Sequence, residues 1–546
     1  MTRKRITTVI ALILSAVTTW AQYRSNVWCP DQGDGTYVNP VIDADYSDPD
    51  VICVGDDYYL TASSFNCMPG LPILHSKDLV NWQIIGHALN SQFPEATRPE
   101  HGNGVWAPCL RFHDGWFYIY WGDPDRGVFM VKTQDPAGRW DAPVLVVEGK
   151  GIIDTTPLWD DDGRCYLANG WAASRCGFNS VLTLRELSAD GTRAISLPVM
   201  VFDGGNENHT TEGPKLYKRD GWYWIFCPAG GVATGWQLAM RSRSPFGPYE
   251  WRKVMHQGAT TINGPHQGAW VHTPFGEDWF LHFQDKGALG RVVHLQPMTW
   301  QQDGWPVIGQ DTDGDGCGEP VLRHRKPQSN SRLIVNPVED DEFDNPVLGK
   351  QWQWQADYQE SFGMPTANGV MRLYNYRLGA GNLWEAPNLL LQKLPTEHFT
   401  ATAKMRIAAK ADHQYGGLVM MGRDYQALVA CREGDHFLMQ LLTAKNADKG
   451  KPHDVQTLAT FEPSERDRID YQPALYLTIY MRARVADGQC RFAYSLDGKH
   501  FHEAGQPFAI REGKWIGAKL GFVSEETNLK GNRGWVDADW IRFSKQ

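Results

Sequence analysis

One arrangement of residues returns five times between residues 41 and 325, and it restricts the fold more than any other feature. Each copy contains a short aromatic segment after a turn rich in Asp or Gly, and successive copies are about fifty to sixty residues apart. The aromatic segments are Asp57–Leu60, Gly115–Tyr118, Arg164–Leu167, Gly221–Trp224 and Asp278–Leu281. Their alternation predicts half-buried strands, and a period of this length is typical of repeat architectures.

A second marker, always beside a proline, precedes each aromatic segment by about ten to thirteen residues. The five markers are Asp48-Pro49, Trp106-Ala107-Pro108, Asp154-Thr155-Thr156-Pro157, Glu212-Gly213-Pro214 and Pro265-His266. Five units that each open with an inner strand favour a five-bladed β-propeller, in which the innermost strands line the axis. We therefore expect the markers to lie at equivalent positions around one central pocket. They would bring three carboxylates, one indole and one imidazole together.

The chain has 546 residues, which is enough for two or three domains. The repeats predict a propeller over residues 22–325, and residues 326–338 are interpreted as a linker. Residues 339–546 show short alternating strands without the repeat, which predicts a two-sheet β-sandwich of the jelly-roll type. The predicted fold class is therefore all-β.

The N-terminus has the pattern of a signal peptide over residues 1–21. Arg3-Lys4-Arg5 is basic, Ile6–Val17 is apolar, and Thr19-Trp20-Ala21 is an acceptable cleavage site. The apolar stretch is too short for a comfortable membrane span. We expect a secreted or periplasmic protein with no membrane span. The ten cysteines permit disulfides in such a protein, but several lie in strand-like segments where a thiol packs as a small hydrophobe.

Charge and composition exclude some partners. The formal net charge is −10, and no basic stripe is present, so we expect no nucleic-acid partner. No CxxC pair indicates zinc, and no organic cofactor is expected. The 23 Trp, 20 Tyr and 22 Phe residues suit a β-rich core and also suit stacking on sugars. The oligomeric state stays open.

The acidic loop Asp311–Gly316 begins like an EF-hand calcium loop. Leu322 stands where that loop needs a bidentate Glu, and no helical pattern flanks it. A plain polar turn is the alternative interpretation.

Asp48, Asp154 and Glu212 are the residue types that cleavage of a glycosidic bond needs. One carboxyl group protonates the leaving oxygen, and a second activates water or attacks the anomeric carbon. A third carboxylate nearby makes the acid harder to ionise through like-charge repulsion. Each residue alone is equally well explained as a turn residue, because Asp favours turns and Pro rigidifies them. Turns alone do not explain three carboxylates in the register of a repeat.

Further motifs give these residues a family context. The motifs are Tyr46-Ser47-Asp48-Pro49-Asp50, Ser63-Ser64-Phe65, Pro69–Ile73, His75–Trp82, Trp106-Ala107-Pro108, Ile153-Asp154, Asp160–Gly163, Thr211–Lys215 and Gly264–Gly268. With them, residues 38–325 resemble glycoside hydrolase family 43 of the β-xylosidase and α-L-arabinofuranosidase type, whose members are five-bladed propellers that cleave pentose linkages. The tail from Phe343 resembles the concanavalin-like β-sandwich that many members carry.

The resemblance implies a role for each carboxylate. Asp48 matches the general base that activates water, and Glu212 matches the general acid. Asp154 matches the residue that orients Glu212 and tunes its acidity. The family inverts the anomeric configuration in one displacement, which requires carboxyl groups about 6.5–9.5 Å apart.

The resemblance also implies binding residues, each with a structural alternative. His266 matches a histidine that faces a central ion, often calcium and usually through water, and a structural axis histidine is the alternative. Arg291 matches an arginine that reaches the sugar, although an ion pair elsewhere would also explain it. Phe65 and Trp106 match walls of the sugar pocket, and core packing is their alternative.

Two stretches depart from the family pattern. Thr155-Thr156-Pro157 replaces a common Pro-Ser after Asp154, and His101–Val105 lacks the arginine of the commoner version. Both flank the expected pocket, so they leave the identity of the sugar open.

The predicted function is an inverting hydrolase that removes terminal xylose or arabinose from plant hemicellulose or pectin-derived oligosaccharides. One alternative is an endo-acting arabinanase or galactan-directed hydrolase. Another is a propeller that binds carbohydrate without catalysis, although the three carboxylates argue against it. Invertase-type propellers would need an Asn-Asp-Pro-Asn motif that Ser47-Asp48-Pro49-Asp50 does not supply.

Overall fold

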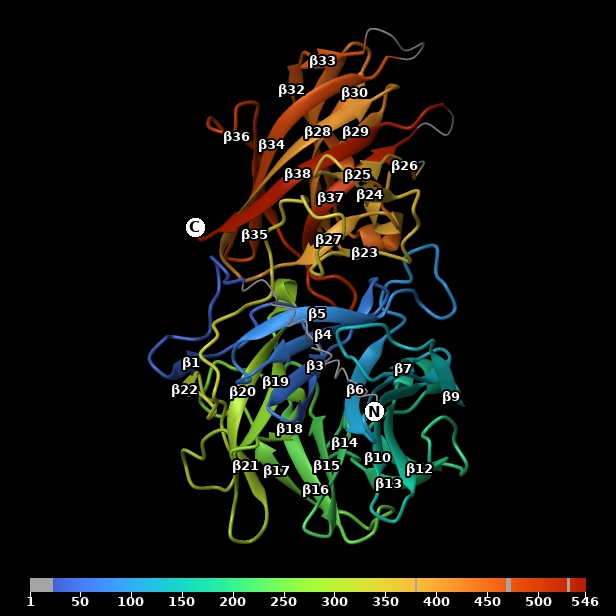
Figure 1. The fold of residues 1–546 in the computed structure, drawn as a ribbon, viewed down its shortest axis with the longest axis vertical. Helices are drawn as coiled ribbons and strands as arrows, with labels where there is room; N and C mark the ends of the chain where they lie inside the picture. The colour runs from blue at the N-terminus through green and yellow to red at the C-terminus, as the bar shows by residue number, and fades with distance from the viewer. Residues whose placement is uncertain (1–22, 379–380, 468–472, 528–530) are drawn as a thin grey trace, which may run out of the picture.

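The structure is a computed structural model that describes residues 23–378, 381–467, 473–527 and 531–546. It has two bodies: five four-stranded sheets coloured blue to green, and two larger sheets coloured yellow to red (Figure 1). The predicted all-β class, with a five-bladed propeller and a β-sandwich, is confirmed. The predicted signal peptide at residues 1–21 lies outside the described residues.

Each propeller blade is an antiparallel sheet in which four consecutive strands pair in order. Blades one and two comprise β2 (Asp50–Val54), β3 (Asp57–Thr61), β4 (Gly70–Ser76) and β5 (Trp82–Leu89), and β6 (Trp106–His113), β7 (Trp116–Asp123), β8 (Gly127–Thr133) and β9 (Val144–Glu148). Blades three and four comprise β10 (Ile152–Trp159), β11 (Cys165–Trp171), β12 (Val181–Leu187) and β13 (Val199–Asp203), and β14 (Lys215–Arg219), β15 (Trp222–Ala229), β16 (Trp236–Ser242) and β17 (Glu250–Met255). Blade five comprises β18 (His266–His272), β19 (Asp278–Asp285), β20 (Arg291–Trp300) and β21 (Pro306–Ile308). Short helical turns α1 (Ala173–Cys176) and η1 (Gly287–Leu289) lie in blades three and five.

The aromatic segments of the repeat are the second strands of the blades. Tight turns join them to the inner strands. Asp114-Gly115 and Asp220-Gly221 both have positive φ at the two central positions. That geometry is the type I′ turn, which Asp-Gly favours because it matches the twist of a hairpin. Local turn chemistry therefore sets the hairpin register that the repeat predicted.

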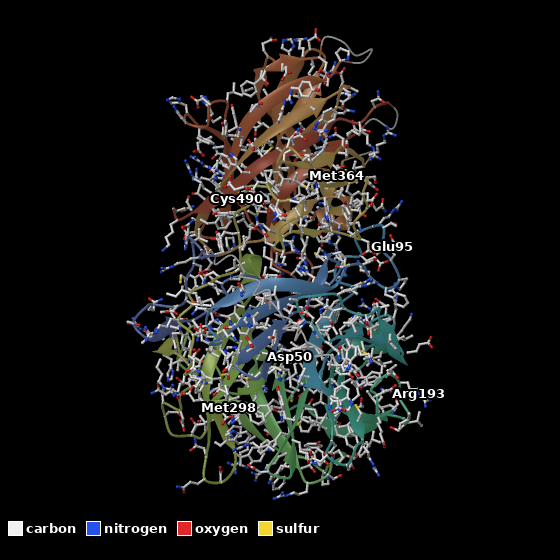
Figure 2. The ribbon with its side chains drawn as sticks, in the orientation of Figure 1. Asp50, Glu95, Arg193, Met298, Met364 and Cys490 are labelled. Carbon is white, nitrogen blue, oxygen red and sulfur yellow. The ribbon has the colours of Figure 1, made fainter. Side chains whose placement is uncertain are left out.

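A buried polar network ties three inner strands together. Asp50 is fully buried near the middle of the propeller (Figure 2). Its Oδ2 accepts hydrogen bonds from the Leu110 N–H at 2.6 Å and from Arg111 Nη1 at 2.9 Å. Lys215 Nζ lies 3.7 Å from Asp50 Oδ1 and donates to the Pro108 carbonyl at 3.0 Å. Blades one, two and four are thus joined by paired charges, which a buried position requires.

The segment before blade one packs on blade five. Strand β1 (Thr36–Val38) pairs with β22 (Arg323–Arg325), which follows the last blade. Ile42 pairs with Val293 on β20, and the Tyr37 hydroxyl donates to the Leu295 carbonyl at 2.7 Å. These contacts hold the start of the propeller chain to its end.

The C-terminal body is a sandwich of two eight-stranded sheets. The first contains β23 (Gln353–Trp354), β27 (Leu390–Lys393), β37 (Lys519–Glu526), β29 (Gln414–Met421), β30 (Tyr425–Glu433), β31 (His436–Ala444) and β32 (Asp454–Phe461), with β26 (Tyr376–Arg377) beside β37. The second contains β24 (Gly363–Pro365), β25 (Met371–Tyr374), β38 (Trp535–Ser544), β28 (Phe399–Ala409), β34 (Leu475–Ala486), β35 (Gln489–Ser495) and β36 (His502–Ala509), with β33 (Glu465–Arg466) beside β34. Two short turns, η2 (Leu383–Glu385) and η3 (Ala447–Lys449), complete it.

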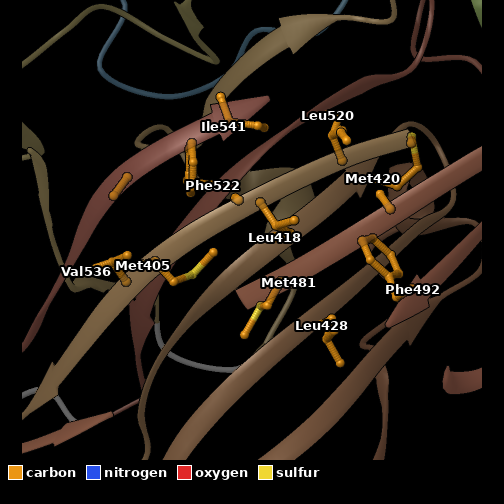
Figure 3. Packing of buried hydrophobic residues seen from close by; sticks show 14 of the residues in the cluster. Met405, Leu418, Met420, Leu428, Met481, Phe492, Leu520, Phe522, Val536 and Ile541 are labelled. Carbon is orange, nitrogen blue, oxygen red and sulfur yellow. The ribbon is translucent and has the colours of Figure 1, made fainter. Parts of the chain in front are cut away.

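The sandwich core lies between its two sheets. Met405, Met481 and Ile541 from one sheet meet Leu418 and Phe522 from the other (Figure 3). The alternating burial along most of β28 and β34 places Met405 and Met481 on the inner face of their sheet. The first sheet is also covered on its other face, where Leu383 and Trp384 of η2 join a second apolar cluster.

The segment interpreted as a linker is held against the propeller. Ser329 Oγ donates to the Lys77 carbonyl at 2.7 Å, and Lys326 Nζ lies 2.5 Å from Asp31 Oδ2 and 2.7 Å from Asp78 Oδ2. Residues 326–338 contain no strand. They form a strap between the two bodies.

All ten cysteines lie in the described ranges, and each is a free thiol. The question that the sequence left open is therefore answered by packing: Cys109, Cys227 and Cys490 are fully buried and behave as small hydrophobes. Within the described ranges, no helix has the length and apolar content that crossing a bilayer requires.

Candidate active site

A cavity of about 250 Å³ opens in the propeller where several inner strands begin. Six of the seven residues singled out from the sequence line it: Asp48, Phe65, Trp106, Asp154, Glu212 and Arg291. The seventh, His266, is fully buried and contacts Glu212. The structure therefore brings all seven predicted residues to one site.

In every blade, a residue with positive φ lies within two positions of the first residue of the inner strand. These residues are Asp48 (56°), Ala107 (33°), Asp154 (57°), Gly213 (59°) and Gln267 (31°). Glu212 stands one residue before this kink, as do Trp106 and His266. The expectation that all three carboxylates occupy equivalent positions is therefore wrong for Glu212. Asp tolerates the left-handed region because its short side chain bonds locally, whereas a glycine takes that position in blade four.

Asp48 is held by three side chains. Its Oδ2 accepts hydrogen bonds from Ser47 Oγ at 2.8 Å and from Ser63 Oγ at 2.6 Å. Arg291 Nη1 lies 3.5 Å from Oδ1 and donates to Ser47 Oγ at 2.8 Å. The guanidinium group also stands over the Phe283 ring, 4.8 Å from its centroid. The carboxylate is thus fixed in direction while it still lines the cavity.

Asp154 is buried between the other two carboxylates. Its Oδ2 accepts hydrogen bonds from the Gly213 N–H at 2.8 Å and from Gln267 Nε2 at 3.3 Å. Burial, and then the charges of Glu212 and Asp48, raise the pKa of Asp154 well above its ordinary value of 3.8. The site therefore resists a full negative charge on all three carboxylates.

Glu212 is the most accessible of the three. Its side chain is 24% exposed, against 6% for Asp48. Its Oε1 lies 2.8 Å from His266 Nε2, and the imidazole is buried beneath it. This contact restrains one oxygen of Glu212 and leaves the other available to the cavity.

Sequence reasoning did not single out Trp515, the residue through which the sandwich contributes a wall to the cavity. Trp515 lies in the loop between β36 and β37, and its ring centroid is 6.1 Å from that of Trp106 in an edge-on arrangement. Trp106 meets Phe65 in the same way at 6.2 Å. The Ala518 N–H donates to the Ala288 carbonyl at 2.8 Å, which anchors the loop on blade five. No local pattern could have indicated Trp515, because its partners lie some 400 residues away in the chain.

Two places among the described residues offer groups that a metal ion could bind. Among the described residues, Asp311, Asp313 and Asp315 alone form a group of three acidic, His or Cys ligands within 4.8 Å of one another, and all three are exposed. Near the axis, His266 Nδ1, Gln267 Oε1 and Thr155 Oγ1 are buried and have no hydrogen-bond partner among the described residues. One imidazole nitrogen with neutral oxygens fits a hydrated ion or water better than a direct calcium cage, which needs several carboxylate or carbonyl oxygens.

Comparison with known proteins places both bodies in one family. The model described as "Glycosyl hydrolases family 43" matches residues 37–306. The model described as "Beta xylosidase C-terminal Concanavalin A-like domain" matches residues 340–544. The two matches follow the boundary between the propeller and the sandwich.

Curated relatives match along most of the chain. A putative β-xylosidase of Xylanibacter ruminicola is 37% identical over 498 residues, which cover 90% of this chain and 87% of the relative. A β-xylosidase of Formosa agariphila is 31% identical, and the match covers 94% of this chain and 91% of the relative. A non-reducing-end α-L-arabinofuranosidase of Bacteroides ovatus is also 31% identical, over 75% of this chain and 79% of its own length.

Solved structures agree with the fold. A family-43 protein of Bacillus licheniformis has a TM-score of 0.77 and 26% identity, and the match covers 94% of this chain and all of that one. A xylan β-1,4-xylosidase of Bacillus halodurans, at 23% identity, has the same fold with a TM-score of 0.80, over 93% of this chain and all of that one. With its two matching models and relatives of this identity and coverage, the chain belongs to glycosyl hydrolase family 43 and is an O-glycosyl hydrolase.

Proposed function

We propose that this protein is an exported, inverting glycoside hydrolase that removes terminal β-D-xylose or α-L-arabinofuranose from hemicellulose or pectin-derived oligosaccharides. The observation that carries the proposal is the meeting of Asp48, Asp154 and Glu212 in one cavity with aromatic walls. The printed names of the relatives, β-xylosidase and α-L-arabinofuranosidase, support a pentose as the sugar released.

The reaction follows from the positions of two carboxyl groups. The Asp48 carboxylate removes a proton from water, and the water oxygen attacks the anomeric carbon. Glu212 gives its proton to the glycosidic oxygen as the bond from that oxygen to the anomeric carbon breaks. Asp48 ends protonated and Glu212 ionised, and exchange with solvent restores both. The product has the opposite anomeric configuration because only one displacement occurs.

The other site residues position these two groups. Asp154 accepts the Gly213 N–H and so holds the backbone next to Glu212. Arg291 orients Asp48 through Ser47 and presents its remaining donors to a sugar hydroxyl. Phe65, Trp106 and Trp515 supply apolar surface for the C–H faces of a pentose ring and exclude bulk water.

Action at a chain end is supported by the wall that the sandwich provides. Trp515 of the sandwich lines the propeller cavity together with the three carboxylates. Such a wall favours entry of a chain by its end over a chain that lies across the site. An endo-acting arabinanase or galactan-directed enzyme needs a groove open at both sides. Export rests on the basic and apolar stretches of residues 1–21.

A calcium ion at the axis is the proposed metal, held through water by His266 Nδ1 with Gln267 Oε1 and Thr155 Oγ1 nearby in the inner strands. Such an ion would supply positive charge to the acidic site. The protein's own part is the contact of His266 Nε2 with Glu212 Oε1 at 2.8 Å.

The test is a panel of chromogenic pentosides with product anomers followed by NMR. Asp48→Asn and Glu212→Gln should each lower kcat about 10²–10⁴-fold, while the matched control Asp311→Asn, an exposed carboxylate outside the cavity, should leave it unchanged. Inversion and release of free pentose are expected. Oligosaccharide products from arabinan or galactan would favour the endo alternative. Wild-type rates for Asp48→Asn or Glu212→Gln would remove the catalytic assignment of that residue. A wild-type protein that hydrolyses none of the pentosides would favour the carbohydrate-binding propeller.

A further inference from the structure

A second concave site lies on the outer face of the sandwich. It is a groove of about 410 Å³ that crosses β25, β38, β28 and β34, with the loop of residues 366–370 at one end. It shares no lining residue with the active-site cavity. We call it the sandwich groove and define it by Arg372, Lys404, Arg406, Thr478, Asp537 and Asp539.

Strand register places a row of charged side chains along the floor of the sandwich groove. Arg372 pairs with Asp537, Asp537 with Arg406, and Arg406 with Thr478, each on the next strand of the sheet (Figure 1). Neighbouring strands are about 4.8 Å apart, so this row extends about 14 Å. That is long enough for several contacts along an extended ligand.

Aromatic side chains flank the row on both sides. Trp535 stands two residues before Asp537, and its ring lies 6.2 Å from that of Tyr476. On the other side, the ring of Trp540 lies 6.1 Å from that of Tyr480. These four residues face outward, because the alternating residues Val536, Ala538 and Ile541 belong to the core. One face of each tryptophan is covered, because Arg372 stands over Trp535 at 4.6 Å and Arg542 over Trp540 at 4.2 Å. The rings therefore border the sandwich groove without lining it.

Each charged side chain of the sandwich groove is in an ion pair, and one partner, Glu465, lies outside the groove lining. Arg372 makes two hydrogen bonds to Asp537, at 2.7 and 2.9 Å. Lys404 Nζ lies 2.5 Å from Asp539 Oδ2, and Arg406 Nη2 lies 2.6 Å from Glu465 Oε2. Three positive groups thus meet three negative ones. A floor without excess charge suits a neutral ligand with many hydroxyls, not an anion or a cation.

The surroundings of the groove argue against a protein partner. The buried centre of a protein–protein interface is typically more apolar than the rest of the surface. Of the large apolar side chains exposed among the described residues, Met364 is the one that lies on this row, opposite Arg372 (Figure 2). The outer face of the other sheet, by contrast, is sealed by η2.

We propose that the sandwich groove binds a neutral pentosan chain and keeps the polymer on the enzyme. Sugar hydroxyls bond to the Arg372–Asp537 and Lys404–Asp539 pairs that line the groove, and the sugar rings contact the uncovered parts of Trp535 and Trp540 at its border. The choice of a pentosan rests on the proposed function, whereas binding in this groove does not depend on which pentose the active site removes.

The test is native gel electrophoresis of the full chain in gels that contain soluble xylan, with excess free xylose to occupy the active site. Asp537→Ala and Trp540→Ala should each weaken retardation about tenfold in apparent dissociation constant, which equals about 1.4 kcal/mol. If either variant does not fold, Asp537→Asn replaces it, because the amide keeps the shape of the side chain, and it should also weaken retardation. Glu503→Gln is the matched control, because its partner Arg484 lies at 2.8 Å on the same sheet outside the groove.

Loss of retardation in the groove variants, with unchanged hydrolysis of aryl pentosides, supports the site. Equal retardation of variants and wild type overturns it, as does a wild-type protein that xylan does not retard. A groove variant that changes from dimer to monomer in sedimentation would assign this face to a second copy of the chain and would also overturn it. Failure of the proposed catalysis would appear separately, in the pentoside panel.

Discussion

Asp45 accepts a hydrogen bond at Oδ2 from the backbone N–H of Gly517, at 2.9 Å, and so joins the propeller to the loop that carries Trp515. Its other oxygen, Oδ1, accepts the N–H of Arg291 at 2.9 Å. The carboxylate is 2% exposed, and the close packing of Gly290 against it leaves no room for a side chain there. The buried side chain of Asp45 therefore holds in position both the backbone of Arg291, which lies beside Asp48, and the sandwich loop that carries Trp515.

Asp45→Ala should lower kcat/KM for aryl pentosides about 10–100-fold, because two backbone donors lose a charged acceptor. We expect most of the change in KM, since Arg291 and Trp515 shift together while Asp48 and Glu212 stay. Asp43→Ala is the matched control: it is buried in the same segment and accepts from Thr396 Oγ1 at 2.7 Å, but it does not contact Arg291. Equal kinetics for Asp45→Ala and Asp43→Ala would contradict the linkage.

Trp515→Ala should open one side of the active-site cavity. The lost ring contact with Trp106 should raise KM for aryl pentosides about 3–10-fold, and long or branched oligosaccharides should become relatively better substrates. The measurement is the ratio of kcat/KM for the two substrate types. Phe178→Ala, an exposed aromatic residue outside the cavity lining, should leave that ratio unchanged. An unchanged ratio in Trp515→Ala would remove its role in end selection.

Asp154→Asn should abolish most activity and stabilise the fold. The folded pKa of Asp154 lies above its value in the unfolded chain, so the folded state holds its proton more tightly. Its contribution to stability is present below about pH 3.8 and is lost as pH rises through the folded pKa. The amide of Asn does not ionise, so the variant keeps this contribution at neutral pH. Each kcal/mol gained in the free energy of unfolding should raise the thermal unfolding midpoint by about 2–4 °C. A lower midpoint than wild type at neutral pH would contradict the charge-repulsion account.

Glu339 gives a pH dependence to the junction between the domains. Burial raises the pKa of Glu339 from 4.5 to about 7, although Ser25 Oγ donates to its Oε1 at 2.6 Å. Its stabilising contribution is therefore present below pH 4.5 and lost as pH rises through 7. Glu339→Gln should have a flatter profile of unfolding midpoint from pH 4.5 to 8 and should exceed wild type above pH 7. The control Glu342→Gln should change stability in the opposite direction, because Arg542 lowers the pKa of Glu342.

The repeat made the propeller predictable, because its information is local. Alternating aromatic segments joined by a turn such as Asp114-Gly115 favour a hairpin through interactions within a few residues. The position of Glu212 was harder to predict. Its repeat unit places Gly213 at the kink of the backbone, so the carboxylate precedes the kink by one residue, and no spacing in the sequence reveals a φ angle.

The sequence by itself determined the all-β class, the number of blades, the sandwich and the acidic residues of the site, because each depends on periodicity and turn chemistry within a few residues. Only the tertiary structure decided which groups meet across the two domains. The contacts from Trp515 to Trp106 and from Gly517 to Asp45 join positions more than 400 residues apart. Such contacts depend on how the sandwich docks on the propeller, and docking leaves no periodic pattern in either segment.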